Sequence, residues 1–200
     1  GDGTFHDRMT WSVDFAPSLI RAADVDGDGA VDLVVASQSG PISVLRNLGD
    51  ANFAAPVTYT LSTTDSIVTA DFDGDGDTDV IAADSFRKKL TVLRNAGDGM
   101  FAVDATTYTL NVNPQQLEAI DADNDGAVDL AVICGGIGIM RNLGGGAFAA
   151  LEEYSLPAGA SDVSVADLDE DGWADLAVSS NGNSSVAVFR NTGNGKFSKA

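Results

Sequence analysis

Aspartate recurs at every second position in four short segments of this 200-residue chain, a pattern that suits the binding of a hard cation. In each segment aspartate stands at positions 1, 3, 5 and 9, and glycine stands at position 6. Alternate positions direct three carboxylates into one loop, glycine permits a sharp turn, and position 9 returns a fourth carboxylate from the next strand. Position 7 can add its backbone carbonyl, which fits the variety of side chains found there. The candidate ligands are Asp24, Asp26, Asp28, Ala30 and Asp32 in the first loop, Asp71, Asp73, Asp75, Asp77 and Asp79 in the second, Asp121, Asp123, Asp125, Ala127 and Asp129 in the third, and Asp167, Asp169, Asp171, Trp173 and Asp175 in the fourth.

Calcium is the cation that this donor set favours. It takes six to eight oxygen ligands, and four carboxylates within nine residues would repel one another strongly without a cation. Magnesium suits such crowded carboxylates less well, and zinc prefers His or Cys, of which the chain has one each. The loops are not EF-hands, because position 12 holds Val35, Ala82, Val132 or Val178 in place of glutamate. A single aspartate-glycine cluster could be a plain solvated turn, but four copies in phase favour about four Ca²⁺ ions, one per repeat.

The aspartate loops belong to an internal repeat of about 48 residues, since the leading aspartates are spaced 47, 50 and 46 residues apart. An Arg-Asn pair keeps the same period and begins at residues 46, 94, 141 and 190. A glycine-rich turn ends in phenylalanine at residues 5, 53, 101, 148 and 197. We expect the asparagine to start a turn, the arginine to pack or pair locally, and the phenylalanine to wedge between repeats. The chain is predicted to be one domain over 1–200, with repeats at about 1–48, 49–96, 97–143 and 144–192, and with 193–200 starting a further repeat.

Each repeat is predicted to contain four short β-strands. In the first repeat the strands cover about 18–24, 31–36, 42–46 and 53–60. The second and third strands are mostly continuous apolar runs, which indicates burial on both faces. Sheets of this kind, repeated about every 40–50 residues, are typical of an all-β propeller whose four-stranded antiparallel blades pack between neighbours. The mildly helical stretch 111–120 falls where the other repeats place a loop and an inner strand, and we expect it to do the same.

The N-terminal residues have the register of an outer strand. Phe5 stands one period before Phe53, so residues 4–13 are expected to pair as the fourth strand of a blade. If the four repeats close a ring, this strand lies beside 186–190 and displaces the C-terminal strand. Otherwise the chain is part of a larger propeller, or an open blade edge joins another molecule in an assembly.

The composition argues against several classes of function. The chain carries 30 Asp and Glu against 11 Lys and Arg, and its formal net charge of −19 disfavours binding to nucleic acid or to an anionic membrane. No apolar run approaches 18 residues, so no membrane insertion is expected. With one His, one Cys and the carboxylates assigned to the loops, the sequence offers no nucleophile–base pair, and the chain is predicted not to be an enzyme.

These motifs resemble the FG-GAP/VCBS repeats of integrin-α-like β-propellers over essentially the whole chain. Family members carry a DxDGDGxxD calcium loop between the first two strands of a blade and an RN-GDG-F turn before the outer strand. The segments "RNLGDANFAAP" at 46–56, "RNAGDGMF" at 94–101 and "RNTGNGKF" at 190–197 match the second motif. Loop position 4 departs from glycine at Asn124 and Glu170, which removes no proposed ligand. The family forms rings of six to eight blades, whereas this chain supplies four periods.

The resemblance and the aspartate loops together predict a calcium-binding, non-enzymatic extracellular propeller module for adhesion, ligand recognition or surface assembly. The alternative is an accessory carbohydrate-binding, lectin-like domain of a larger secreted hydrolase. The expected partner is a protein or a glycan, with possible self-assembly through open blade edges, and neither nucleic acid nor a membrane is expected. An extracellular or cell-surface location follows from the weak calcium affinity of extracellular modules, about 10⁻⁴ to 10⁻³ M, which resting cytosol does not satisfy.

Overall fold

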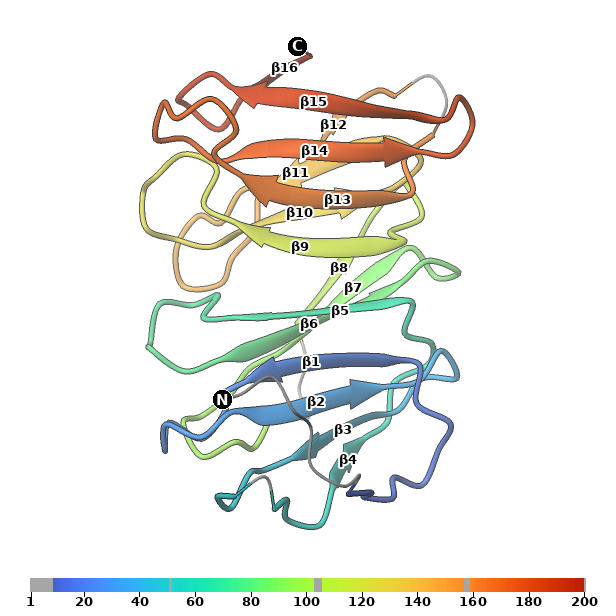
Figure 1. Cartoon of the computed structure of the whole chain (residues 1–200), viewed down its shortest axis with the longest axis vertical. Helices are drawn as coiled ribbons and strands as arrows, with labels where there is room; N and C mark the ends of the chain where they lie inside the picture. Colours follow the sequence, from blue (N-terminus) through green and yellow to red (C-terminus); the bar gives the residue numbers. More distant parts are fainter. Residues whose placement is uncertain (1–8, 51, 103–105, 157–158, 200) are drawn as a thin grey trace, which may run out of the picture.

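The computed structural model of this chain describes residues 9–50, 52–102, 106–156 and 159–199. Within these ranges the chain forms sixteen β-strands and no helix, arranged as four separate antiparallel sheets of four strands (Figure 1). The all-β propeller class predicted from the sequence is therefore confirmed. The described residues accordingly contain no helix that could cross a membrane.

The strands follow one order in every sheet, from an inner strand to an outer one. Blade 1 is formed by β1 (Leu19–Ala23), β2 (Asp32–Ala36), β3 (Ile42–Leu45) and β4 (Val57–Tyr59). Blade 2 is formed by β5 (Ser66–Ala70), β6 (Asp79–Asp84), β7 (Lys89–Leu93) and β8 (Thr106–Thr109). Blade 3 is formed by β9 (Gln116–Ile120), β10 (Asp129–Ile133), β11 (Ile137–Met140) and β12 (Glu152–Tyr154). Blade 4 is formed by β13 (Asp162–Ala166), β14 (Asp175–Ser180), β15 (Ser185–Asn191) and β16 (Phe197–Lys199).

The predicted strands of the first repeat agree with β1 to β4, and the stretch 111–120 contains the inner strand β9 as expected. The middle strands are buried on both faces, most completely in β3, β6, β10 and β11, whose residues are all buried. This burial explains their continuous apolar runs, because each middle strand packs against neighbours on two sides. Each sheet is shifted along the chain relative to the predicted repeat. Its outer strand follows the phenylalanine marker of the next repeat, as β4 follows Phe53.

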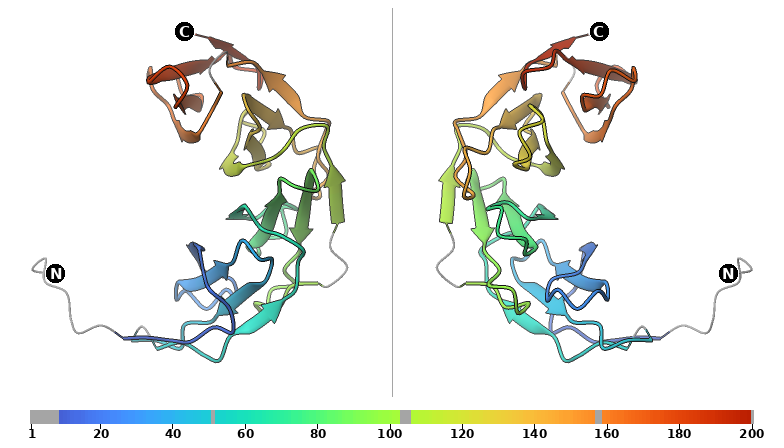
Figure 2. Two further views of the ribbon diagram at one scale, coloured as in Figure 1. Left: turned by 90° about the vertical axis from the view of Figure 1, so that its right-hand side faces the viewer. Right: turned by 90° about the vertical axis from the view of Figure 1, so that its left-hand side faces the viewer.

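The blades stack face to face along a curved arc, with blades 1 and 4 at its two ends (Figure 2). An apolar core lies between each pair of consecutive blades. The same five positions of a blade supply its side of the core with the preceding blade. They are Ile67, Val80, Ala82, Leu93 and Phe101 in blade 2, Leu117, Leu130, Val132, Met140 and Phe148 in blade 3, and Val163, Leu176, Val178, Phe189 and Phe197 in blade 4.

The marker phenylalanines sit in these interfaces, as predicted. Phe101 meets Tyr59 of the preceding blade edge to face, with ring centroids 5.7 Å apart, and its backbone N–H donates to the tyrosine hydroxyl at 3.0 Å. Phe148 with Tyr108, and Phe197 with Tyr154, repeat this contact at centroid distances of 5.6 and 5.7 Å. Edge-to-face aromatic pairs add about 0.5–1.5 kcal/mol beyond the area that they bury.

Closure of the four blades into a ring, one of the sequence-based alternatives, does not occur in this structure. β16 pairs with β15 in blade 4, so the C-terminal strand is not displaced by the N-terminus. The described residues 9–13 belong to no strand, which corrects the expectation of an outer strand there, while residues 4–8 of that prediction lie outside the described part. The physical reason is that each blade turns the stack only partly, and four such steps leave the end blades apart (Figure 2).

Candidate metal centres

The four aspartate loops lie on one edge of the arc, on the left in Figure 1. Each loop connects the inner strand of a blade to its second strand. Position 1 follows the inner strand directly, and position 9 is the first residue of the second strand, as Asp71 and Asp79 are in blade 2. The two strands pair antiparallel, so the ends of the nine-residue loop are held side by side.

Positions 1, 3 and 9 of every loop converge on one point. In each group the three carboxylates bring one oxygen apiece within 4.8 Å of one another. The groups are Asp24, Asp26 and Asp32; Asp71, Asp73 and Asp79; Asp121, Asp123 and Asp129; and Asp167, Asp169 and Asp175. Twelve of the sixteen predicted carboxylates are thus brought together, three per blade.

The aspartate at position 9 is the anchor of each loop. Its side chain is buried in all four blades, with a relative exposure of 0 or 1%. In blade 2 the two carboxylate oxygens of Asp79 accept hydrogen bonds from the backbone N–H groups of Phe72 at 3.2 Å and Asn95 at 2.8 Å. The other three copies make the same pair of bonds. This carboxylate therefore ties the loop to the Arg-Asn turn of its own blade.

Burial raises the pKa of two of these anchoring carboxyls. The pKa of Asp79 rises to about 6, because loss of water outweighs the backbone hydrogen bonds and because Asp73 and Asp75 add negative charge. The pKa of Asp129 rises to about 6 for the same reasons, because burial outweighs its backbone hydrogen bonds and the negative charges of Asp123 and Asp125 add to the rise. A cation placed beside these groups would favour their ionised form.

The aspartate at position 1 shapes the turn. It accepts a hydrogen bond from the backbone N–H of the glycine at position 6, over 2.9 Å from Gly76 to Asp71 and 2.9 to 3.1 Å in the other copies. That glycine has a positive φ, between 86° and 96° in the four loops. The left-handed backbone costs glycine nothing, which confirms the role predicted for it from the sequence.

The aspartate at position 3 is paired with the arginine of the Arg-Asn marker. The pairs are Asp26 with Arg46 at 3.4 Å, Asp123 with Arg141 at 3.3 Å, Asp169 with Arg190 at 2.9 Å, and Asp73 with Arg94. This confirms the predicted local pairing of the arginines. Because each arginine engages one carboxylate oxygen from outside the loop, the other oxygen is left to face the loop interior.

Buried oxygens without a hydrogen-bond donor show that the loops fit a cation. Oδ1 of Asp26, Asp123 and Asp169 is buried and has no hydrogen-bond partner among the described residues, and the same holds for Oδ1 of Asp121. A buried carboxylate oxygen without a donor is costly unless a positive charge satisfies it. All four lie in the three-carboxylate groups, where a divalent cation would complete them.

The position 5 carboxylates are not part of these three-carboxylate groups. The side chain at position 5 instead accepts a hydrogen bond from the backbone N–H of position 7, as Asp75 does from Asp77 at 2.9 Å. The same short turn joins Asp28 to Ala30, Asp125 to Ala127 and Asp171 to Trp173, at 2.7 to 2.9 Å. Binding of a cation by the position 5 carboxylates and position 7 carbonyls remains a prediction from the sequence.

The marker asparagine has a second role that the sequence reasoning missed. Its side-chain carbonyl starts a turn, as predicted: Asn95 Oδ1 accepts from the N–H of Gly97 at 3.1 Å. Its Nδ2 group donates to the carbonyl of Val25 in the preceding blade at 2.6 Å and to that of Thr78 at 3.0 Å. Asn142 and Asn191 bridge their blades in the same way. The available signal was that all four copies keep asparagine, whereas the next position holds Leu, Ala or Thr.

Stacked four-stranded blades with an aspartate loop after each inner strand define a repeat β-propeller. The sequence profile of the FG-GAP-like repeat matches residues 24–82 and 71–132, which together cover more than half of the chain. The chain therefore belongs to the FG-GAP-like repeat family. Blade 4 lies outside the matched residues and has the same loop geometry.

Two crystal structures of BBS1N in complex with ARL6DN share this fold. The one soaked with lead superimposes with a TM-score of 0.65 and 15% sequence identity, over 90% of this chain and 55% of that one. The one soaked with mercury gives a TM-score of 0.63 and 18% identity, over 94% and 55%. The chain thus spans about half the length of the structures that it matches. A search of curated protein sequences found no match.

Proposed function

We propose that this chain is a calcium-binding, non-enzymatic propeller module that recognises another protein outside the cell. The observation that carries the calcium role is the buried carboxylate oxygen without a donor, which lies in the three-aspartate group of blades 1, 3 and 4. In each loop the aspartates at positions 1, 3 and 9 would hold the ion. Calcium suits this set because it accepts many oxygens in flexible geometry.

The role of the ion would be structural. Four divalent cations would reduce the formal net charge from −19 to −11, and would relieve the repulsion inside each loop. Each ion would also join the inner strand, the second strand and the loop of one blade. The Arg-Asn turn would be held to the same centre through the position 9 carboxylate.

Recognition of a protein partner is supported by the family and by the fold. BBS1N, which has this fold at low sequence identity, was crystallised in complex with ARL6DN. The fold alone does not identify the partner of the present chain, because one fold can bind many different ligands. The net charge of −19 favours a partner whose contact surface is basic.

The extracellular location rests on calcium affinity. Extracellular calcium modules bind at about 10⁻⁴ to 10⁻³ M, a range filled outside cells and not in resting cytosol, and we expect these loops to bind calcium in that range. Calcium binding with a micromolar or lower Kd would contradict this argument for an extracellular location.

Calorimetric titration with calcium tests the proposal in the intact chain. We expect about four sites in the wild type and one fewer in Asp26→Asn, which keeps the shape of the side chain and removes a charge from the first group. Asp50→Asn is the matched control, because Asp50 lies outside the loops and has a positive φ that asparagine tolerates. No heat of binding at millimolar calcium, or an equal number of sites in both variants, would contradict the proposal.

A further inference from the structure

A polar hollow lies at the internal interface between blades 1 and 2. Its floor is formed by Ala82, Thr91 and Thr107, which are neighbours across β6, β7 and β8 of blade 2. Its wall is the connection that leaves the outer strand β4 of blade 1, at residues 60–63. The hollow has a volume of about 320 Å³, at the lower end of the range of about 300–1,000 Å³ that is usual for small-molecule sites. Both of its sides belong to described blades that pack on each other, so it is part of an internal interface.

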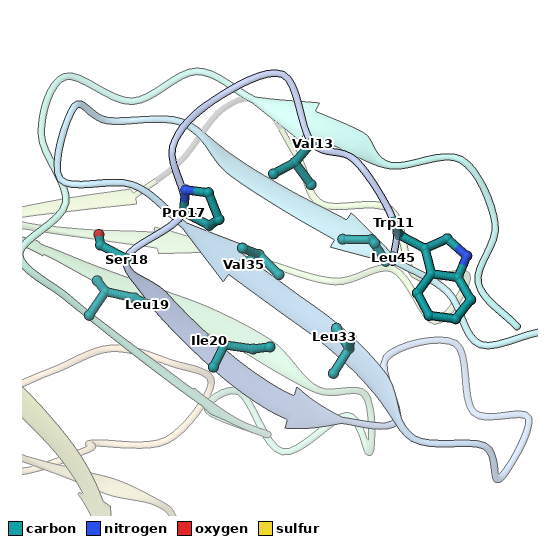
Figure 3. A pocket seen from close by; sticks show the side chains of 9 residues that line it. All are labelled: Trp11, Val13, Pro17, Ser18, Leu19, Ile20, Leu33, Val35 and Leu45. Carbon is teal, nitrogen blue, oxygen red and sulfur yellow. The ribbon is translucent and has the colours of Figure 1, made fainter. Parts of the chain in front are cut away.

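The same place at two other blades is apolar or filled. On the face of blade 1 the corresponding hollow is lined mostly by apolar side chains, among them Val35 and Leu45 (Figure 3). In blade 3 the counterpart of Thr91 on the third strand is Gly138. The side chain of Leu151 covers that glycine so closely that an added Cβ would lie 2.7 Å from Leu151 Cδ1. The fold therefore does not require a polar lining here, and blade 2 departs from its own repeat.

Hydroxyl groups are the main polar groups of the lining in blade 2. They belong to Thr60, Ser62, Thr63, Thr91 and Thr107. In blade 1 the counterparts of Thr91 and Thr107 are Ser43 and Thr58, whose hydroxyls bond to each other at 2.6 Å. In blade 2 the two threonine hydroxyls make no hydrogen bond to a described residue. Because a hydroxyl both donates and accepts, this lining suits a ligand that itself carries many hydroxyls, as a sugar does.

A lysine adds a positive charge to the same lining. Lys89 is half-buried there and has no ion-pair partner among the described residues. Its two neighbours in the basic run 87–89 are both engaged, since Arg87 pairs with Asp84 at 3.1 Å and Lys88 Nζ donates to the carbonyl of Asn111 at 3.2 Å. The matching position in the other blades holds Pro41, Gly136 and Ser185. The ammonium of Lys89 therefore favours a ligand with an anionic group such as a carboxylate.

The acidic loop of blade 2 lies at the opposite end of β6 from this lysine. Asp79 begins the strand, and Asp84, the register partner of Lys89, ends it. Five residue steps of about 3.3 Å place these two ends about 16 Å apart. The Debye length at physiological salt is about 8 Å, so the charges of the loop are largely screened at the hollow. Asp84 itself is paired with Arg87. An anionic ligand can thus bind here although the net charge of the chain is −19.

We propose that this hollow binds a sugar unit that carries a carboxylate, such as a uronic acid residue of a glycan. The ammonium of Lys89 pairs with the carboxylate, and the threonine and serine hydroxyls exchange hydrogen bonds with the hydroxyls of the sugar ring. Phe86, next to Arg87 on the β6–β7 turn, is 83% exposed and offers an apolar ring face to an adjoining sugar unit. This site goes beyond the protein recognition proposed above, and it does not depend on calcium.

Calorimetric titration of the intact chain with acidic oligosaccharides tests the site. The probes are trigalacturonate and a hyaluronan tetrasaccharide, each compared with its carboxyl-reduced, neutral form at one fixed calcium concentration. We expect at least one acidic probe to bind, and its neutral form to bind about ten-fold more weakly or worse. Lys89→Met, which keeps the length of the side chain and removes its charge, should weaken binding about ten-fold or more. Thr91→Val, which keeps the shape and removes the hydroxyl, should weaken it about three-fold or more.

Lys88→Met is the matched control, because it makes the same change of charge one position away and Lys88 is not among the lining residues. It should bind the probe like the wild type. Thermal unfolding and calcium titration of all three variants should match the wild type, which separates loss of this site from misfolding and from failure of the calcium proposal. The proposal is overturned if neither acidic probe binds, if the neutral forms bind equally well, or if the two lysine variants lose affinity alike. Tighter binding at Lys89 of a sulfated sugar or a polyglutamate peptide would also overturn it.

Discussion

At the residue scale, the position 9 aspartates connect stability to protonation. Asp79 and Asp129 are buried, and each accepts two backbone hydrogen bonds while its pKa is raised to about 6. A raised carboxyl pKa means that the folded chain binds more protons than the unfolded chain between about pH 4 and pH 6. In the absence of a cation these two groups therefore contribute a loss of stability as the pH rises through that window.

Calcium should reverse the preference of these two carboxyls, because it binds the ionised form. We expect the calcium affinity of the loops in blades 2 and 3 to fall about ten-fold between pH 7 and pH 5, as protons compete at a group with a pKa of about 6. Calorimetry at the two pH values measures this. Equal affinity at both would mean that neither carboxyl belongs to its site.

Loop position 4 carries backbone strain in two of the four copies. Its φ is positive in all loops, at 69° and 80° for Gly27 and Gly74 but also at 52° for Asn124 and 61° for Glu170. Asparagine tolerates this conformation, whereas glutamate does so at a cost of about 1–2 kcal/mol. Glycine at this position would relieve the strain. Part of the gain in stability would be lost, because glycine gives the unfolded chain more conformational freedom.

We expect Glu170→Gly to stabilise the protein by about 0.5–1 kcal/mol. Urea unfolding measures the change, and Glu170→Ala is the control because it removes the charge and keeps the Cβ atom that causes the strain. If alanine stabilises the chain as much as glycine does, the effect comes from charge and the strain argument is wrong.

At the element scale, the Arg-Asn turn adds a hydrogen bond from one blade to the next. In blade 2 the Asn95 side chain donates to two backbone carbonyls, one of them in blade 1, and accepts from Gly97. The asparagine is 4% exposed, so these partners have little access to water once it is removed. A buried backbone group left without its partner costs about 1–3 kcal/mol.

We expect Asn95→Ala to destabilise the chain by about 2–4 kcal/mol in urea unfolding. Asn47→Ala offers a matched control at the equivalent position of blade 1, because among the described residues Asn47 makes the turn and one carbonyl bond but no bond to another blade. Its cost should be clearly smaller. Similar losses for the two variants would show that the turn alone, and not the link between blades, sets the role of this asparagine.

At the scale of the whole molecule, stability should depend on calcium. An ion that binds only the folded chain stabilises it by about 2.7 kcal/mol when its concentration is 100 times its Kd. For a domain of this size that corresponds to a rise in Tm of about 5–10 °C. We expect chelation by EDTA to lower the Tm by at least about 5 °C and excess calcium to restore it.

Thermal unfolding followed by circular dichroism checks this expectation. Magnesium at the same concentration is the control, since it demands a smaller and more regular shell and should restore less of the Tm. An identical Tm in EDTA and in calcium would exclude a structural role for the ion in this chain.

The sequence by itself determined the features that depend on neighbours along the chain. Alternating carboxylates, a glycine at loop position 6 and apolar runs of strand length are local patterns, and repetition every 48 residues or so made each of them more reliable. The strands, the positive φ of the loop glycines and the loop between the first two strands of each blade were therefore predictable. Family membership followed from the same local motifs.

Only the tertiary structure decided how residues distant in sequence meet. Asn95 reaches a carbonyl 70 positions away, and Arg94 meets Asp73 across two strands, because packing of one blade on another and pairing of strands bring them together. Within the loop, the position 5 carboxylates accept hydrogen bonds from the backbone, whereas the carboxylates at positions 1, 3 and 9 converge. The hydrogen-bond donors that the folded loop offers to each carboxylate decide between these two arrangements. The open arc likewise depends on the small rotation at each blade interface, which accumulates over the whole stack and which no single motif encodes.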